Sequence, residues 1–98
     1  MFVGQKINGM KAKKLIEKKG GLLIDVRPPT SFRDGTLPGA INISLRQISS
    51  LLKHPKNTQL IFFADTNDDE DLRAALNYAV QLGFGNIYSL GAKDNWNK

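Results

Sequence analysis

The 98 residues of this chain are 41% hydrophobic and 23% charged, which is typical of a soluble globular protein with one hydrophobic core. The chain has no cysteine, which excludes disulfides, thiolate metal sites and thiol catalysis, and its longest apolar run, residues 60–64, is far shorter than the ~20 residues of a membrane span. The net charge is +5, but residues 1–20 hold six lysines and one glutamate, whereas residues 65–71, here called the acidic segment, hold five carboxylates and no basic residue.

The chain also lacks the sequence signs of export, repetition or long linkers. Its first residues contain no cationic stretch followed by an apolar one, so we expect no signal peptide and a cytoplasmic location. No internal repeat or low-complexity stretch interrupts the sequence. We therefore expect residues 1–98 to form a single domain that is monomeric and does not enter a membrane.

Hydrophobic periodicity and turn residues divide the chain into alternating helices and strands. In chain order they predict a helix over residues 10–19, a strand over 22–26, one helical turn over 30–34, a strand over 40–43, a helix over 44–53, a strand over 59–64, a helix over 72–82 and a strand over 86–90. This alternation favours an α/β layer fold around a mainly parallel sheet. In such sheets ligands bind outside the carboxyl ends of the strands, and the acidic segment follows a strand at such an end.

Capping residues mark the ends of several predicted helices. Gly20-Gly21 is expected to end the first helix, and Ser44 is the candidate N-cap of the helix over residues 44–53. Asp68 or Asp69 is expected to cap the helix that follows the acidic segment, because an aspartate can accept hydrogen bonds from the free amides of a first turn.

Five short motifs follow one another along the chain in a known order. They are an apolar stretch that ends in Asp25-Val26-Arg27, a Gly-Thr-Leu-Pro-Gly-Ala element at residues 35–40, an Ala-rich helix that ends in Leu82-Gly83-Phe84, a stretch at residues 86–91, and a closing turn with Asp94 and Trp96. In this order and spacing they resemble the rhodanese family. The resemblance implies a three-layer α/β sandwich with a mainly parallel central sheet flanked by helices, and it makes Asp25, Arg27, Gly35, Pro38, Gly39 and Ala40 the structural signature.

The chain departs from this family at its working site. Members that transfer sulfur carry a cysteine directly after the central strand, at the start of a loop whose amides surround the thiolate. The corresponding loop here comprises Ala64, Asp65, Thr66, Asn67, Asp68, Asp69, Glu70 and Asp71. Counting forward from the strand puts the cysteine position at Ala64, and counting back from Leu82-Gly83-Phe84 puts it at Thr66. Neither is a cysteine, and the carboxylates would repel an anionic sulfur donor.

We therefore expect a rhodanese-like domain without catalytic residues or cofactor, which acts as a binding or regulatory module for an unknown protein partner. The alternative is an enzyme of the sulfurtransferase family with a different nucleophile, such as Asp65 or Thr66. A carboxylate is a poor acceptor for sulfane sulfur, and the sequence offers Thr66 no nearby histidine for activation. Asp25 and Arg27 are expected to anchor the loops at the end of their strand rather than to act in catalysis.

Two further patterns favour ordinary surfaces over binding sites. The spacing of Asp65, Asn67 and Asp69 resembles the start of a calcium loop, but Glu70 and Leu76 replace the required glycine and glutamate, so we expect no metal. The lysines of the first helix lack interleaved aromatic residues for stacking on bases, so we expect a solvated helix face and no nucleic acid.

Overall fold

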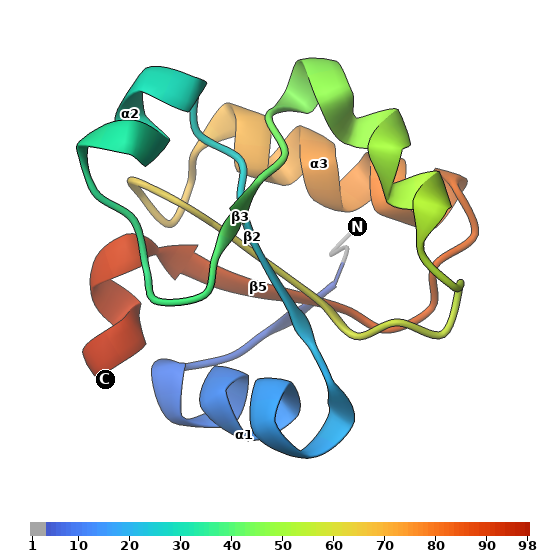
Figure 1. The fold of residues 1–98 in the computed structure, drawn as a ribbon, viewed down its shortest axis with the longest axis horizontal. Coiled ribbons are helices and arrows are strands. Elements are labelled where there is room, and N and C mark those ends of the chain that lie inside the picture. Colours follow the sequence, from blue (N-terminus) through green and yellow to red (C-terminus); the bar gives the residue numbers. More distant parts are fainter. Residues whose placement is uncertain (1–3) are drawn as a thin grey trace.

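A computed structural model describes residues 4–98, in which five strands form one parallel sheet in the order β1-β5-β4-β2-β3 (Figure 1). The strands are β1 (Gln5–Lys6), β2 (Leu22–Asp25), β3 (Ile41–Asn42), β4 (Leu60–Ala64) and β5 (Ile87–Ala92). The helices are α1 (Gly9–Lys19), α2 (Pro29–Asp34), the 3₁₀ helix η1 (Leu45–Lys53), α3 (Glu70–Gln81) and the 3₁₀ helix η2 (Lys93–Asn97).

Helices cover both faces of the sheet, which gives three layers. Successive residues of the buried strand β4 point to opposite faces, so Ile61 and Phe63 pack with Ala12 and Leu15 of α1. The intervening residues of the same strand pack in the core formed with α3 and η1. Figure 1 shows α1 on one side of the sheet and α3 on the other. The predicted α/β sandwich is therefore confirmed, and all described strand pairs are parallel.

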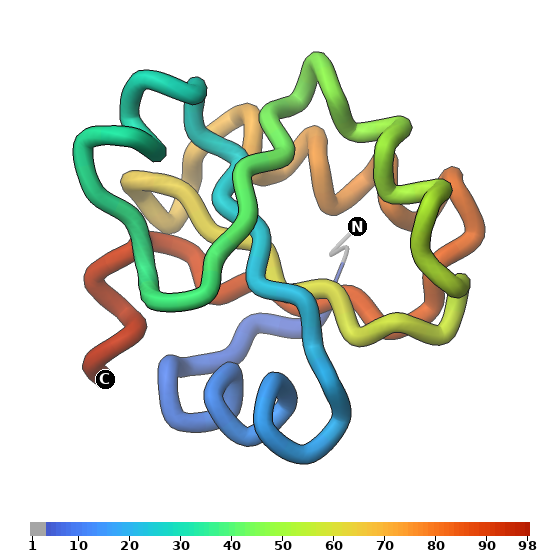
Figure 2. The backbone as a smooth tube through the Cα atoms, viewed as in Figure 1, coloured from blue at the N-terminus to red at the C-terminus, as the bar shows by residue number. Residues whose placement is uncertain are grey.

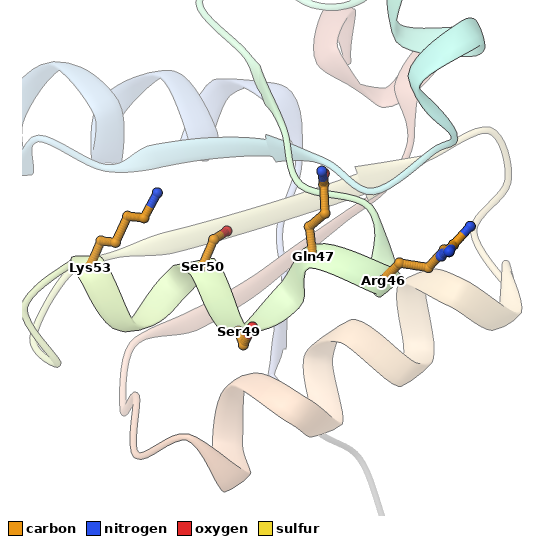
Figure 3. A pocket seen from close by; sticks show the side chains of 5 residues that line it. All are labelled: Arg46, Gln47, Ser49, Ser50 and Lys53. Carbon is orange, nitrogen blue, oxygen red and sulfur yellow. The ribbon is translucent and has the colours of Figure 1, made fainter.

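The helix η1 follows the spacing of its apolar residues. Leu45, Ile48 and Leu51 recur every three residues, and a 3₁₀ helix with three residues per turn places all three on one inward face. Figure 3 shows the outer side chains, where Gln47, Ser50 and Lys53 form a second row along the helix. A helix was predicted here, but Ser44 is not its side-chain cap: it occupies the N-cap position and its side chain makes no cap hydrogen bond.

The other predicted elements are present with small shifts at their ends. The first helix ends as expected, because Gly20 adopts a φ of 66° and its amide donates to the carbonyl of Ile16. The structure adds β1 and η2, which the sequence analysis did not predict. Within residues 4–98, no helix is both long enough and apolar enough to cross a membrane.

Candidate functional site

A buried ion pair lies at the carboxyl end of β2. Asp25 is fully buried and Arg27 is 7% exposed. The guanidinium donates from Nη2 to Asp25 Oδ2 at 2.7 Å and from Nε to Oδ1 and Oδ2 at 3.0 and 3.1 Å, and the Arg27 backbone amide donates to Oδ1 at 2.9 Å. This two-pronged contact supplies the hydrogen bonds that a buried charge needs.

Two other segments contact the residues of this ion pair. Thr36 Oγ1 donates to Asp25 Oδ2 at 2.8 Å, and Arg27 Nη2 donates to the carbonyl of Gly35 at 2.6 Å. Asn42 of β3 donates from Nδ2 to the backbone carbonyls of Asp25 and Arg27, at 2.9 Å each. Asp25 and Arg27 therefore contact both the segment after α2 and the edge strand β3.

The remaining signature residues form the turn that leads into β3. The Ala40 amide donates to the carbonyl of Leu37 at 3.1 Å, and Gly39 adopts a φ of 77°. Pro38 followed by a glycine with positive φ is the pattern of a type II turn. These residues shape the backbone, and Pro38 and Gly39 are exposed.

The charge state of Arg27 is held fixed by this environment. Hydrogen bonds to the Asp25 carboxylate raise the pKa of Arg27 above its ordinary value, burial opposes this shift, and the charge of Asp25 and the contact with Asp65 reinforce it. A raised folded pKa stabilises the fold below the unfolded pKa, and this contribution is lost only as pH rises through the folded pKa, which lies above the already strongly basic value of a free arginine. Titration of Arg27 therefore does not switch the site near neutral pH.

The loop between β4 and α3 is held by its own polar side chains. Asp65 Oδ1 accepts from Arg27 Nη1 at 3.1 Å, and Asn67 Oδ1 accepts from the Ala92 amide at 2.9 Å and from Asn95 Nδ2 at 2.8 Å. Figure 2 shows this loop beside the segment that follows α2, and Arg27 contacts both. Sequence reasoning did not identify Asn67 as an anchor, because its partners lie 25 and 28 residues away.

Asp69 ends this loop as the N-cap of α3. Its Oδ1 accepts from the Leu72 amide at 3.0 Å, so of the two predicted candidates, Asp68 and Asp69, the structure selects Asp69. Asp65, Asn67 and Asp69 thus contact three separate parts of the molecule. Among residues 4–98 there is no cluster of three or more His, Cys, Asp or Glu side chains that could hold a metal ion.

The two candidate cysteine positions lie in different environments. Ala64 is the last residue of β4 and is fully buried in the core shared with α3 and η1. Thr66 lies in the loop and is exposed. The only histidine of the sequence, His54, lies between η1 and the start of β4, whereas Thr66 follows the end of β4. The two residues are therefore at opposite ends of this strand. The loop therefore presents carboxylates and one hydroxyl to solvent, and the imidazole of His54 does not lie beside that hydroxyl.

Comparison with known proteins agrees with this geometry. A family model described as the rhodanese-like domain matches residues 10–98. Similar solved structures include a rhodanese-like domain from Anabaena, with a TM-score of 0.74 and 17% identity over 99% of this chain and 74% of that one. A single-domain sulfurtransferase from Saccharomyces cerevisiae has a TM-score of 0.75 and 22% identity over 99% and 91%. The reduced CoADR-RHD protein of Bacillus anthracis has a TM-score of 0.75 and 21% identity over 96% of this chain and 16% of that one.

The two carboxylates that contact Arg27 are expected to differ sharply in their effect on stability. Asp25→Ala leaves a buried guanidinium without its main partner and should lower the free energy of unfolding by about 3–5 kcal/mol. Asp65 is 64% exposed, so Asp65→Ala should cost at most about 1 kcal/mol. Urea unfolding at neutral pH measures both, with Asp34→Ala as a control at an exposed carboxylate. Equal costs at positions 25 and 65 would contradict this assignment.

The N-cap of α3 gives a second stability test. Asp69→Ala removes the hydrogen bond to the Leu72 amide and should cost about 0.5–2 kcal/mol. Asp68→Ala should be neutral or stabilising, because the Asp68 side chain makes no hydrogen bond within residues 4–98 and lies among other carboxylates. Thermal melts in low and high salt separate the loss of the capping hydrogen bond from the relief of charge repulsion, since salt screens repulsion between exposed charges. A gain in stability for both variants would rule out the capping role.

Proposed function

The chain belongs to the rhodanese-like domain family, and because it contains no cysteine we propose that it is a binding module that does not transfer sulfur. The acidic segment would bind a basic surface of a protein partner at the carboxyl ends of the strands, where the family's catalytic loop lies. The observation that carries this proposal is that only two carboxylates of this segment, Asp65 and Asp69, make contacts that hold the loop. The other three carboxylates are exposed to solvent.

The missing reaction follows from the chemistry of sulfur transfer. A thiolate is the nucleophile in such exchanges, and no thiol exists in this sequence. The nearest replacement, Asp65, is bound to Arg27, which reduces the nucleophilicity of its carboxylate. Thr66 has no histidine beside it to remove its proton, and the carboxylate of the adjacent Asp65 is paired with Arg27. These contacts support a module without the family's activity over an enzyme with a substitute nucleophile.

The partner's charge is inferred from the carboxylates of the acidic segment that make no ion pair and do not cap α3, here called the unused carboxylates. Asp65 contacts Arg27 and Asp69 caps α3. Asp68, Glu70 and Asp71 are exposed and make no ion pair within residues 4–98. Three like charges within four residues give a concentrated negative surface, which steers and binds positively charged partners. A basic peptide or a basic face of another protein fits this surface.

Reintroducing a cysteine is not expected to restore activity. In Ala64→Cys the thiol would lie in the apolar core, where burial raises a thiol pKa, and in Thr66→Cys it would lie beside carboxylates, which also raise the pKa and repel anionic donors. Neither variant should form thiocyanate from thiosulfate and cyanide above the level of the native chain, which should show none. Reaction with a thiol reagent provides the control.

In that control, the thiol of Thr66→Cys should react in the folded protein, whereas that of Ala64→Cys should react only after unfolding. Sustained turnover by either variant would show that the loop still accepts an anionic donor. Turnover by the purified native chain would contradict the proposed loss of activity directly.

The partner is tested by neutralising only the unused carboxylates. The triple variant Asp68→Asn, Glu70→Gln, Asp71→Asn retains the contacts of Asp65 and Asp69. The matched control Glu17→Gln, Asp34→Asn, Asp94→Asn changes the net charge equally at three other exposed positions. Proteins captured from a lysate of the source cells should be rich in basic surfaces, and they should be lost with the first variant and retained with the second. Equal capture by both variants would exclude the acidic segment as the binding surface.

A further inference from the structure

We propose that a small pocket at the carboxyl ends of β1 and β5 binds a small carboxylate with a short apolar chain. The pocket has a volume of about 240 Å³ and is lined by Lys6, Ile7, Asn67, Ser89, Leu90, Gly91 and Asn95. It lies on the β5 side of the loop after β4, whereas Arg27 and Asp25 lie on the β2 side. This site does not depend on a partner for the acidic segment.

A β-bulge and a glycine shape the pocket. Phe62 pairs with Ser89 and Phe63 pairs with Gly91, so Leu90 has no partner on β4 and the backbone of β5 turns there. Gly91 adopts a φ of 79°, and a Cβ at this position would collide with Asn67 Oδ1. The absence of a side chain lets Asn67 reach the Ala92 amide, which fixes this wall of the pocket.

The orientation of the Asn67 amide follows from this contact. A backbone N–H can only donate, so the atom that accepts from Ala92 must be the carbonyl oxygen Oδ1. Oδ1 accepts a second hydrogen bond from Asn95. The Nδ2 group of Asn67 makes no hydrogen bond within residues 4–98 and therefore remains available as a donor.

Ser89 supplies a second available group. Ser89 is only 8% exposed, and its hydroxyl makes no hydrogen bond within the described part of the chain. Within the described residues, every side-chain nitrogen or oxygen that is fully shielded from solvent has a hydrogen-bond partner. The Ser89 hydroxyl has no partner among these residues and is therefore open to solvent. Because Ser89 lines the pocket, we place this opening there. Buried hydroxyls normally have a partner, so a hydroxyl open to a pocket indicates a place for one.

Lys6 adds a positive charge to these donors. It is exposed, pairs with Ser89 in the β1–β5 ladder and makes no ion pair within residues 4–98. No carboxylate lines the pocket. An ammonium, a hydroxyl and an amide NH₂ together select a ligand with negatively charged oxygen acceptors. Ile7, which is only partly buried, provides apolar surface, and the small volume limits the ligand to a few heavy atoms.

The neighbouring negative charges set the affinity. Asp65 is directed to Arg27 and Asp69 to the Leu72 amide, but Asp68 follows Asn67 and is exposed. Its charge opposes an anion, and a ligand with few atoms can gain only limited binding energy. A dissociation constant of roughly millimolar is therefore expected.

Nuclear magnetic resonance titration of the full chain at constant ionic strength tests the site. Butyrate is expected to shift the amide resonances of Ser89 and Gly91 and the side-chain NH₂ resonances of Asn67. Formate, which lacks the apolar chain, should bind more weakly, and n-butylammonium should not bind. Lys6→Gln and Ser89→Ala should each weaken butyrate about tenfold, as expected for the loss of one charge-assisted hydrogen bond. Lys11→Gln, at an exposed lysine of α1, is the charge-matched control.

The result that overturns the proposal is a lack of saturable shifts at these resonances. Equal binding of butyrate and n-butylammonium would also overturn it, as would unchanged butyrate affinity in both Lys6→Gln and Ser89→Ala with native spectra. If formate bound as tightly as butyrate, the site would recognise the carboxylate alone, and the proposed contact with a short apolar chain would be wrong. None of these outcomes bears on capture of a basic protein by the acidic segment, so the two proposals fail separately.

Discussion

The Asp25–Arg27 ion pair lies where four parts of the chain meet, at the carboxyl end of β2. A charge removed from water is stable only if its hydrogen-bonding capacity is filled, so every group that fills it is held in place. Gly35 and Thr36 supply two such groups after α2, and the backbone carbonyls of Asp25 and Arg27 accept hydrogen bonds from the side chain of Asn42. The path of the segment before β3 thus depends on this buried pair, whereas β3 itself is held by Asn42 and by its pairing with β2.

The loop after β4 is held in place by groups of the chain itself. The resemblance to the rhodanese family implies that backbone amides at this place surround a thiolate in members that transfer sulfur. Here the Leu72 amide at the start of α3 is bound by Asp69, and Asn67 ties the middle of the loop to the end of β5. The chain supplies its own acceptor where a foreign anion would otherwise be favoured by the helix dipole. This internal use of the helix start agrees with the absence of a nucleophile.

Most of the fold could be predicted because it depends on local patterns. The apolar strand over Leu60–Ala64 and the glycine stop after α1 are both visible in sequence, whereas β1 has only two residues and carries no periodicity. The spacing of Leu45, Ile48, Leu51 and Leu52 predicts a helix but not its type, because the exposure of Leu52, which separates the 3₁₀ pattern from the α-helical one, is visible only in the structure. The roles of Asn67 and Gly91 could not be predicted, because their contact joins a loop to a bulge 24 residues later.

The carboxylates of the acidic segment differ in how far the fold accounts for them. Glu70 and Asp71 lie in the first turn of α3, where the helix dipole makes a negative charge favourable by about 0.3–1 kcal/mol. Two unit charges 4 Å apart in water repel by about 1 kcal/mol, so the benefit and the cost nearly cancel. Asp68 precedes the cap residue and contacts no cation within residues 4–98, so it has only the cost. No ion pair within residues 4–98 offsets this cost, so Asp68 is the carboxylate of the acidic segment for which the fold accounts least.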